Sequence, residues 1–217
     1  MLMLVLTLAF GAVSGARAAE NVTINGCPIR PATLCGGMNL QNAALNGADL
    51  ARSDLSKANL SGANLSGANL RSATLDDVDL RQANARGAIL DRADLTRANL
   101  NGAAFANASL IAATLVDAKL ENADLSAAIL RGGQLNNALL GGATLARAQM
   151  QRADLTNAVL ANADLRGADL TGAVLKSADL RGANLTGAVL RGADFTGART
   201  RGCRGCPPVR RQGRAGG

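Results

Sequence analysis

The sequence predicts an all-β fold, a solenoid in which the chain coils around a thin core of leucine and alanine. Three observations predict it: a leucine recurs every five residues, an alanine recurs two residues before it, and aromatic residues are nearly absent. The 217 residues include three Phe and no Trp, Tyr or His. Because aromatic side chains are the bulky packing units of ordinary cores, their scarcity favours a narrow, regular interior.

The repeat runs without insertion over residues 38–202, as 33 consecutive pentads whose centres are five residues apart. Leucine occupies 28 of the centres, and alanine stands two residues earlier in 29 pentads. Two residues after the centre, Gly occurs 14 times and Asn six times, and both tolerate the positive φ of a tight turn. The centres that depart from leucine are Ala85, Phe105, Met150, Phe195 and Thr200.

A period of five excludes a straight helix and a straight strand. On an α-helix each five-residue step advances about 140°, so the leucines would form no stripe. On a strand an odd step sends successive leucines to opposite faces. The chain keeps every leucine inside only if it bends within each pentad. The residue just before each leucine then points outward, and it is often polar, as at Asp49, Asn59 and Asp164.

The repeat resembles the pentapeptide repeat family, whose motif A-[D/N]-L-x-x appears here as Ala58-Asn59-Leu60-Ser61-Gly62. The resemblance spans about three quarters of the chain. It implies a right-handed quadrilateral β-helix, with four pentads per coil and about eight coils over the repeat. It does not imply a shared active site, because the family fold is a scaffold.

In such a coil each leucine stacks on its counterpart four pentads later. Ala85 and Phe105 are four pentads apart, so a small side chain is expected to lie beside a large one and to keep the local volume constant. The column that we take as representative of the core is Leu60, Leu80, Leu100, Leu120, Leu140, Leu160 and Leu180.

Residues 1–18 match a secretory signal peptide. An apolar run from Leu2 to Val13 is followed by small residues, which predicts cleavage between Ala18 and Ala19. The run is short for a membrane span, although no Lys or Arg precedes it. The alternative is a buried N-terminal helix. The signal predicts an extracytoplasmic bacterial protein, either periplasmic or secreted.

Four cysteines flank the repeat. We expect an N-terminal cap over residues 19–37, with Cys27 and Cys35, and an Arg-rich, disordered tail over 203–217, with Cys203 and Cys206. A rod of ~4.8 Å per coil would hold its ends roughly 40 Å apart, and disulfide partners must approach within about 7 Å. Export therefore predicts the local pairs Cys27–Cys35 and Cys203–Cys206. The alternatives are a CxxC redox site at Cys203 and Cys206, which lacks a thioredoxin-like βαβ context, and a four-cysteine zinc site, which would need both ends of the rod together.

The formal net charge of +7 is concentrated at the ends of the chain. Residues 38–200 carry 16 Lys and Arg against 15 Asp and Glu, whereas 201–217 carry five Arg and no acid. A near-copy of Thr156–Leu170 at Thr171–Leu185 advances three sides of the coil, so we expect no uniform charged stripe.

Asp76, Asp77 and Asp79 form the densest acidic cluster, with Arg71 and Arg81 nearby in sequence. Solvated charge is favoured here over a calcium site. We expect no metal and no cofactor.

An enzyme is not expected. Without His there is no Ser-His-Asp constellation, and no Gly-rich phosphate loop occurs outside the repeat turns. The leading hypothesis is an exported structural or interaction scaffold whose flat sides meet a protein or an envelope surface, with no small-molecule substrate. The resemblance offers an alternative, nucleic-acid mimicry against topoisomerases, which the neutral body and the export signal disfavour.

Two further alternatives stay open. The Arg-rich tail could attach the protein to anionic lipid, lipopolysaccharide or nucleic acid, although direct binding of nucleic acid is not expected of the neutral body. Two copies could also pair through the end of the solenoid near Phe195.

Overall fold

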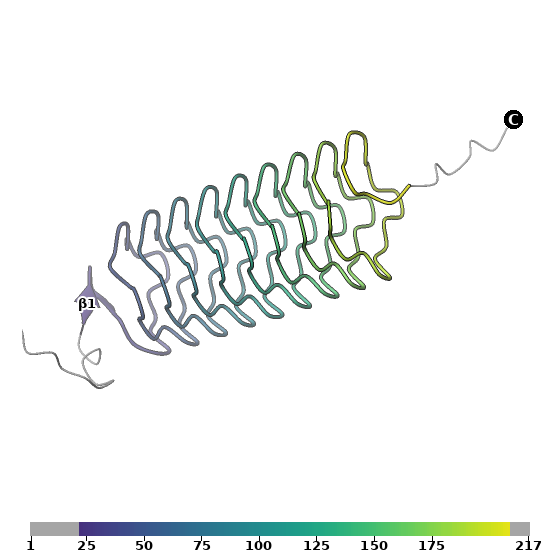
Figure 1. Ribbon diagram of the computed structural model, residues 1–217. Helices are drawn as coiled ribbons and strands as arrows, with labels where there is room; N and C mark the ends of the chain where they lie inside the picture. The colour runs from purple at the N-terminus through teal and green to yellow at the C-terminus, as the bar shows by residue number, and fades with distance from the viewer. Residues whose placement is uncertain (1–21, 209–217) are drawn as a thin grey trace, which may run out of the picture.

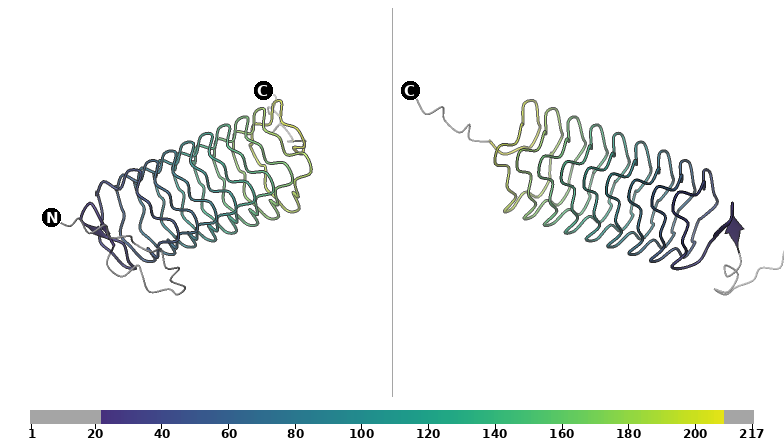
Figure 2. Two further views of the ribbon diagram at one scale, coloured as in Figure 1. Left: turned by 60° about the vertical axis from the view of Figure 1, so that its left-hand side comes forward. Right: turned by 180° about the vertical axis from the view of Figure 1, so that it is seen from behind.

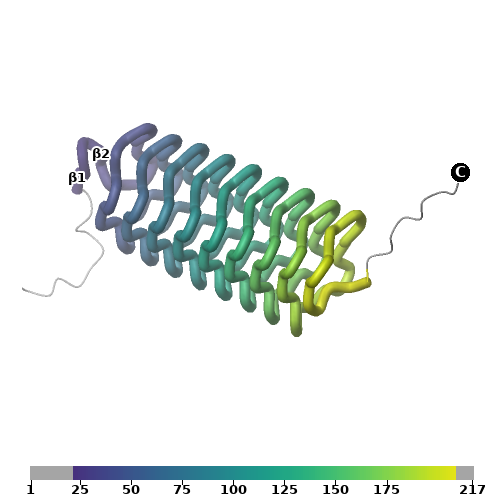
Figure 3. Tube along the Cα trace, turned by 90° about the horizontal axis from the view of Figure 1, so that it is seen from above, coloured from purple at the N-terminus to yellow at the C-terminus, as the bar shows by residue number. Residues whose placement is uncertain are grey.

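The computed structural model describes residues 22–208, which form a straight rod of stacked coils (Figures 1 and 2). A short antiparallel hairpin comes first, with β1 at Thr23–Ile24 and β2 at Cys27–Pro28. After it, isolated parallel β-bridges join outward-facing residues to those 20 positions later, at every fifth residue. One coil therefore contains four pentads, and the coils lie directly above one another (Figure 3).

The backbone ladder explains why the rod has bridges rather than long strands. Each side of the coil is straight for about the length of one bridge before the chain turns. On one side, the amide of Leu120 donates to the carbonyl of Leu139 at 2.7 Å, and the amide of Lys119 donates to Ala98 at 2.9 Å. The corner closes with the Ala123 amide donating to the Leu120 carbonyl at 3.1 Å. Neighbouring coils thus satisfy each other's backbone groups on every side.

We number the four sides of the coil by their pentad centres. The first side holds the pentads centred on Leu40 and every twentieth residue after it, and the second side those that begin with Leu45. The third side begins with Leu50. The fourth begins with Cys35, followed by Leu55.

The pentad centres and the alanines before them fill the interior. Every leucine of the column from Leu60 to Leu180 is at most 1% exposed. Ala85 and Phe105 are also buried, and they lie one above the other on the second side, where the Ala85 amide donates to the Ala104 carbonyl at 2.7 Å. Stacked leucines can therefore fill the core without large aromatic side chains.

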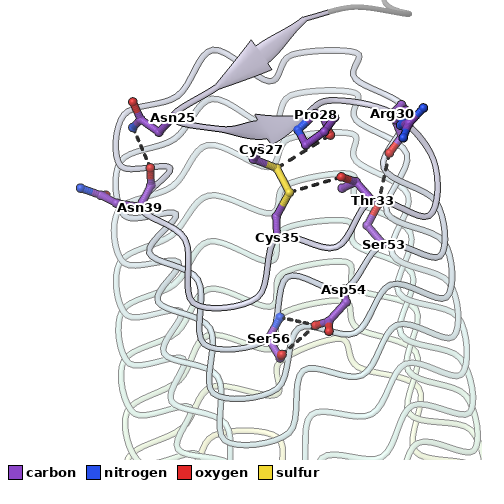
Figure 4. The surroundings of a disulfide bond; sticks show 10 residues. All are labelled: Asn25, Cys27, Pro28, Arg30, Thr33, Cys35, Asn39, Ser53, Asp54 and Ser56. Carbon is purple, nitrogen blue, oxygen red and sulfur yellow. Dashed lines mark hydrogen bonds between the residues drawn. A yellow bond between two sulfur atoms is a disulfide. The ribbon is translucent and has the colours of Figure 1, made fainter.

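The N-terminal hairpin covers the first coil (Figure 4). Cys27 is buried there and bonded to Cys35, with 5.5 Å between their Cα atoms. The side-chain amide of Asn25 donates to the Asn39 carbonyl at 2.7 Å. That carbonyl belongs to the first coil of the described residues, and the Asn25 side chain donates to it in the way that an amide of a preceding coil would.

The ladder extends beyond the predicted repeat at both ends. It starts with the bridge from Leu34 to Asp54, four residues before the predicted start at 38, and reaches Arg204, two residues past the predicted end at 202. The ladder begins before residue 38 because Cys35 keeps the pentad register and points inward. Residues 1–18, with the predicted cleavage site at Ala18 and Ala19, and residues 209–217 of the tail lie outside the described part of the chain.

At the C-terminal end, the last coil is closed by a short loop. Cys203 is bonded to Cys206, with 5.8 Å between their Cα atoms, and both pack against the inward side chains of the last coil. Phe195 is 8% exposed in that coil, and Leu190 is partly exposed.

Between residues 22 and 208, the structure contains no helix that is long and apolar enough to cross a bilayer.

Candidate interaction surfaces

Three positions of each pentad face outward: the residue before the leucine and the two after it. Because the coils are in register, equivalent residues of successive coils form straight rows along the rod. These rows, rather than a pocket, are the main surface that the fold offers.

In many pentads, hydrogen bonds between residues of the same pentad fix the direction of the outward side chains. The carboxylate oxygen Oδ1 of Asp54 accepts hydrogen bonds from the Ser56 amide at 3.0 Å and the Ser56 hydroxyl at 2.7 Å. Asp169 is bound in the same way by Thr171, at 2.9 and 2.6 Å. The pattern Asp-Leu-Ser/Thr therefore fixes the carboxylate and the corner together.

In the three pentads where aspartate precedes the leucine and arginine follows it, the arginine pairs with that aspartate. In Arg166 the Nε and Nη2 atoms donate to the two carboxylate oxygens of Asp164, at 2.9 and 2.7 Å. The same bidentate pair occurs between Arg81 and Asp79, and again in a third pentad nearer the C-terminal end. These arginines are more than half exposed, so each pair adds little stability but sets the direction of both side chains.

The hydrogen bonds also keep these carboxylates charged. The Ser56 hydroxyl and amide hold the pKa of Asp54 below its ordinary value, and the guanidinium of Arg166 does so for the pKa of Asp164. A carboxyl with a lowered pKa is a poor proton donor near neutral pH.

Charge is distributed unequally among the four sides. The fourth side carries three basic residues and seven aspartates, namely Asp54, Asp76, Asp77, Asp94, Asp117, Asp154 and Asp194. The third side carries three aspartates and six arginines, namely Arg52, Arg71, Arg92, Arg131, Arg152 and Arg191. Each of these two sides has an excess of one sign, but neither forms a uniform stripe, because both signs occur on each of them. The register of four pentads per coil brings together charges that are far apart in the sequence.

The acidic cluster of the sequence is divided between two sides. Asp79 faces outward on the first side, paired with Arg81, whereas Asp77 lies on the fourth side and binds Arg97 of the next coil at 2.8 Å. Arg71 instead pairs with Asp91, at 3.2 Å. Asp77 and Arg97 are 20 residues apart, which is one full coil, and this spacing is the sequence signal from which their ion pair could have been predicted. Within the described residues, no three His, Cys, Asp or Glu side chains form a group that could hold a metal ion.

A polar groove of about 490 Å³ runs along the corner that follows the first side. There Gly62 and Gly102 alternate with Asn42 and Gln82, whose side chains lie over the glycine of the next coil. The groove offers amide and hydroxyl groups and a single charged residue, Arg81.

The four cysteines form the two local disulfides at the ends of the rod. In the described residues, both cysteines of the CxxC sequence are thus in a disulfide.

The square coil of four pentads, with leucine columns inside and Asp or Asn before many of the leucines, defines a pentapeptide-repeat β-solenoid. The pentapeptide repeats family matches in eight copies, over residues 37–71, 63–102, 73–110, 103–142, 134–172 and 168–204. The chain belongs to this family, which confirms the resemblance drawn from the motif.

Two solved structures show how far the likeness extends. HetL, a pentapeptide repeat protein involved in the regulation of heterocyst differentiation in the cyanobacterium Nostoc sp. strain PCC 7120, is 34% identical, with a TM-score of 0.62. The match covers 80% of this chain and 87% of HetL. QnrB1, a plasmid-mediated fluoroquinolone resistance protein, has a TM-score of 0.63 over 75% of this chain and 86% of its own, but at 20% identity it shows the fold alone. Among curated proteins there is no match.

Proposed function

We propose that this protein is an exported, non-enzymatic scaffold that presents rigid sides to a protein or an envelope surface. The observation that carries the proposal is the uninterrupted ladder from Leu34 to Arg204, on which outward side chains stand in straight rows of distinct charge. A surface that is already ordered loses little conformational entropy when a partner binds, so it suits recognition over a large area.

Two observations support export. The sequence of residues 1–18 has the pattern of a signal peptide. A disulfide also closes each end of the rod, and such bonds persist in oxidising compartments.

The chemistry of the surface supports a binding role over catalysis. Asp54, Asp164 and Asp169 are each engaged by hydrogen bonds that lower the carboxyl pKa, so they favour the charged form. Such groups recognise cations and hydrogen-bond donors, whereas a general acid needs a raised pKa.

Fractionation of the native host, followed by cross-linking of the intact protein, tests the proposal. We expect the mature chain outside the cytoplasm, cut after Ala18, with a mass that rises by four hydrogens on reduction and with a cross-linked partner in the same fraction. A cytoplasmic, uncleaved chain cross-linked to a topoisomerase would overturn it and would favour the alternative of nucleic-acid mimicry.

A further inference from the structure

The six arginines of the third side lie at one corner of the rod, where the third side meets the fourth. We call them the arginine edge: Arg52, Arg71, Arg92, Arg131, Arg152 and Arg191. All six are exposed. Among the ion pairs of residues 22–208, only the one from Arg71 to Asp91 involves this edge.

The arginines of other corners behave differently for a local reason. Arg81 and Arg166 each find an aspartate two residues earlier in their own pentad. On the arginine edge, Arg131 follows Ile129 and Arg191 follows Val189, so that local carboxylate is missing. The edge therefore presents guanidinium groups that the described chain leaves largely without an anionic partner.

A row of aspartates runs beside the edge on the fourth side. We call it the aspartate row: Asp54, Asp94, Asp154 and Asp194. Each is followed by Ser or Thr two residues later, whose amide donates to Oδ1 at 2.9 to 3.0 Å. In Asp54 and Asp94 the described residues leave the second carboxylate oxygen, Oδ2, without a hydrogen bond.

Residues of the arginine edge and of the aspartate row lie at the same height along the rod. The sequences Arg52-Ser53-Asp54, Arg92-Ala93-Asp94 and Arg152-Ala153-Asp154 each place an arginine of the edge and an aspartate of the row in one coil. None of these three arginines forms an ion pair with its neighbouring aspartate in the described chain, because the Ser or Thr that follows already binds and orients the carboxylate.

We propose that the arginine edge and the aspartate row together form a self-complementary surface on which a second copy of this chain docks side by side, with the two rods parallel. Rotation by a half-turn about an axis parallel to the rod preserves the level of each coil and exchanges edge for row. Arg52 then meets Asp54 of the second copy, and Arg92 and Arg152 meet Asp94 and Asp154 in the same way. Antiparallel rods would set edge against edge.

The aspartate row is also the reason for choosing a second copy over a polyanion. A linear polyanion on the arginine edge would run beside the aspartate row, which lies on the next side of the same coils and would repel it. A second copy satisfies both rows at once. Because the contacts are exposed charge pairs, the pairing is sensitive to salt. The pairing of two copies does not depend on the compartment in which the protein acts, so it stands apart from the proposal of export.

Sedimentation equilibrium of the purified, disulfide-intact protein tests the pairing. We expect a dimer at low salt, with a Kd at least about tenfold weaker in ~0.5 M salt. The triple variant Arg52→Glu, Arg92→Glu, Arg152→Glu should be monomeric. The matched control Lys119→Glu, Arg147→Glu, Arg199→Glu changes three cations that lie on other sides and form no ion pair in the described chain, and it should still dimerise.

Neutralising the row gives a second, milder variant. Asp54→Asn, Asp94→Asn, Asp154→Asn keeps an oxygen that can accept the bond from the corner amide, so it should fold and yet dimerise more weakly. Charge reversal provides the rescue: Asp54→Lys, Asp94→Lys, Asp154→Lys should be monomeric alone and should form a heterodimer when mixed with the Arg→Glu triple variant.

The direction of the rods is measured with a nitroxide at Ser72→Cys, an exposed corner position near the N-terminal end of the edge. Parallel rods keep the two labels at one level, whereas antiparallel rods separate them by about five coils, roughly 24 Å along the axis. A wild-type monomer at low salt, equal loss of dimer in the control, or a long label distance would each overturn the proposal. So would a monomer that binds a sulfated polysaccharide through the edge.

Discussion

At the scale of the residue, the position within the pentad sets the physical role of each side chain. Leu120 is fully buried in its column, whereas Lys119 before it is exposed although both take part in the same ladder. Sequence alone could predict this division, because the period of five leaves one way to keep the leucines together. It could not predict Asn25, whose amide completes the first coil, since no repeat position announces it.

Leu120→Asp should lower the free energy of unfolding by about 4 kcal/mol or more, because it places an unpaired carboxylate among apolar side chains. Lys119→Ser should change it by no more than about 0.5 kcal/mol. Thermal and urea melts compare the two variants, and equal losses would refute the assignment of inward and outward positions.

Glycine matters most where the backbone of another coil is close. A Cβ atom on Gly205 would lie 2.7 Å from the backbone carbonyl of Leu185, and its φ is +76°. On Gly192, with φ +69°, the nearest atom would be 4.0 Å away. Gly192→Ala should therefore cost about 1–2 kcal/mol, the penalty of a left-handed residue, while Gly205→Ala should cost more.

Hydrogen exchange at the Arg204 amide reports the effect locally, since this amide bonds to the Ala183 carbonyl at 2.9 Å. Gly205→Ala should remove its protection and Gly192→Ala should leave it. Unchanged protection in both variants would show that the end of the ladder does not depend on the glycine.

At the scale of the element, one side of the coil packs as a column whose volume is shared between neighbours. Ala85 and Phe105 are stacked on the second side, the one place in the described chain where a leucine column gives way to a small and a large residue in succession. This pairing could be predicted from their separation of four pentads. The hairpin of β1 and β2 could not, because two-residue strands carry no periodic signal.

A double-mutant cycle measures the shared volume. Ala85→Leu should cost about 1–3 kcal/mol through overpacking against Phe105, and Phe105→Leu should cost about 1 kcal/mol through a cavity beside Ala85. The double variant restores two consensus leucines and should recover most of the loss. Strictly additive losses in urea melts would mean that the two side chains do not touch.

At the scale of the whole molecule, the fold is a sum of similar contacts between neighbouring coils. The repeat predicted its extent within four residues at the start and two at the end. The surface was harder to predict, because the ion pair of Asp77 with Arg97 joins two coils and the groove depends on how Asn42 and Gln82 lie over glycines.

Acid should destabilise the rod, because many of its carboxylates accept hydrogen bonds that are lost on protonation. Hydrogen bonds lower the pKa of Asp54, Asp169 and Asp194 in the folded state, so their stabilisation is present above the unfolded pKa of about 4 and is lost as the pH falls through the folded values. We expect a constant Tm from pH 7 to about 5 and a decline below about 4. Asp169→Asn should flatten that decline slightly, and a Tm that rises on acidification would contradict the assignment.

The register of four pentads per coil is the claim on which the columns, the charged sides and the pairing of two copies all rest. Scalar couplings through hydrogen bonds, measured by NMR, test it directly. We expect the Leu120 amide nitrogen to couple to the Leu139 carbonyl and the Lys119 amide to couple to the Ala98 carbonyl. Couplings from these amides to carbonyls one helical turn earlier in the sequence would indicate a helix and would contradict the solenoid.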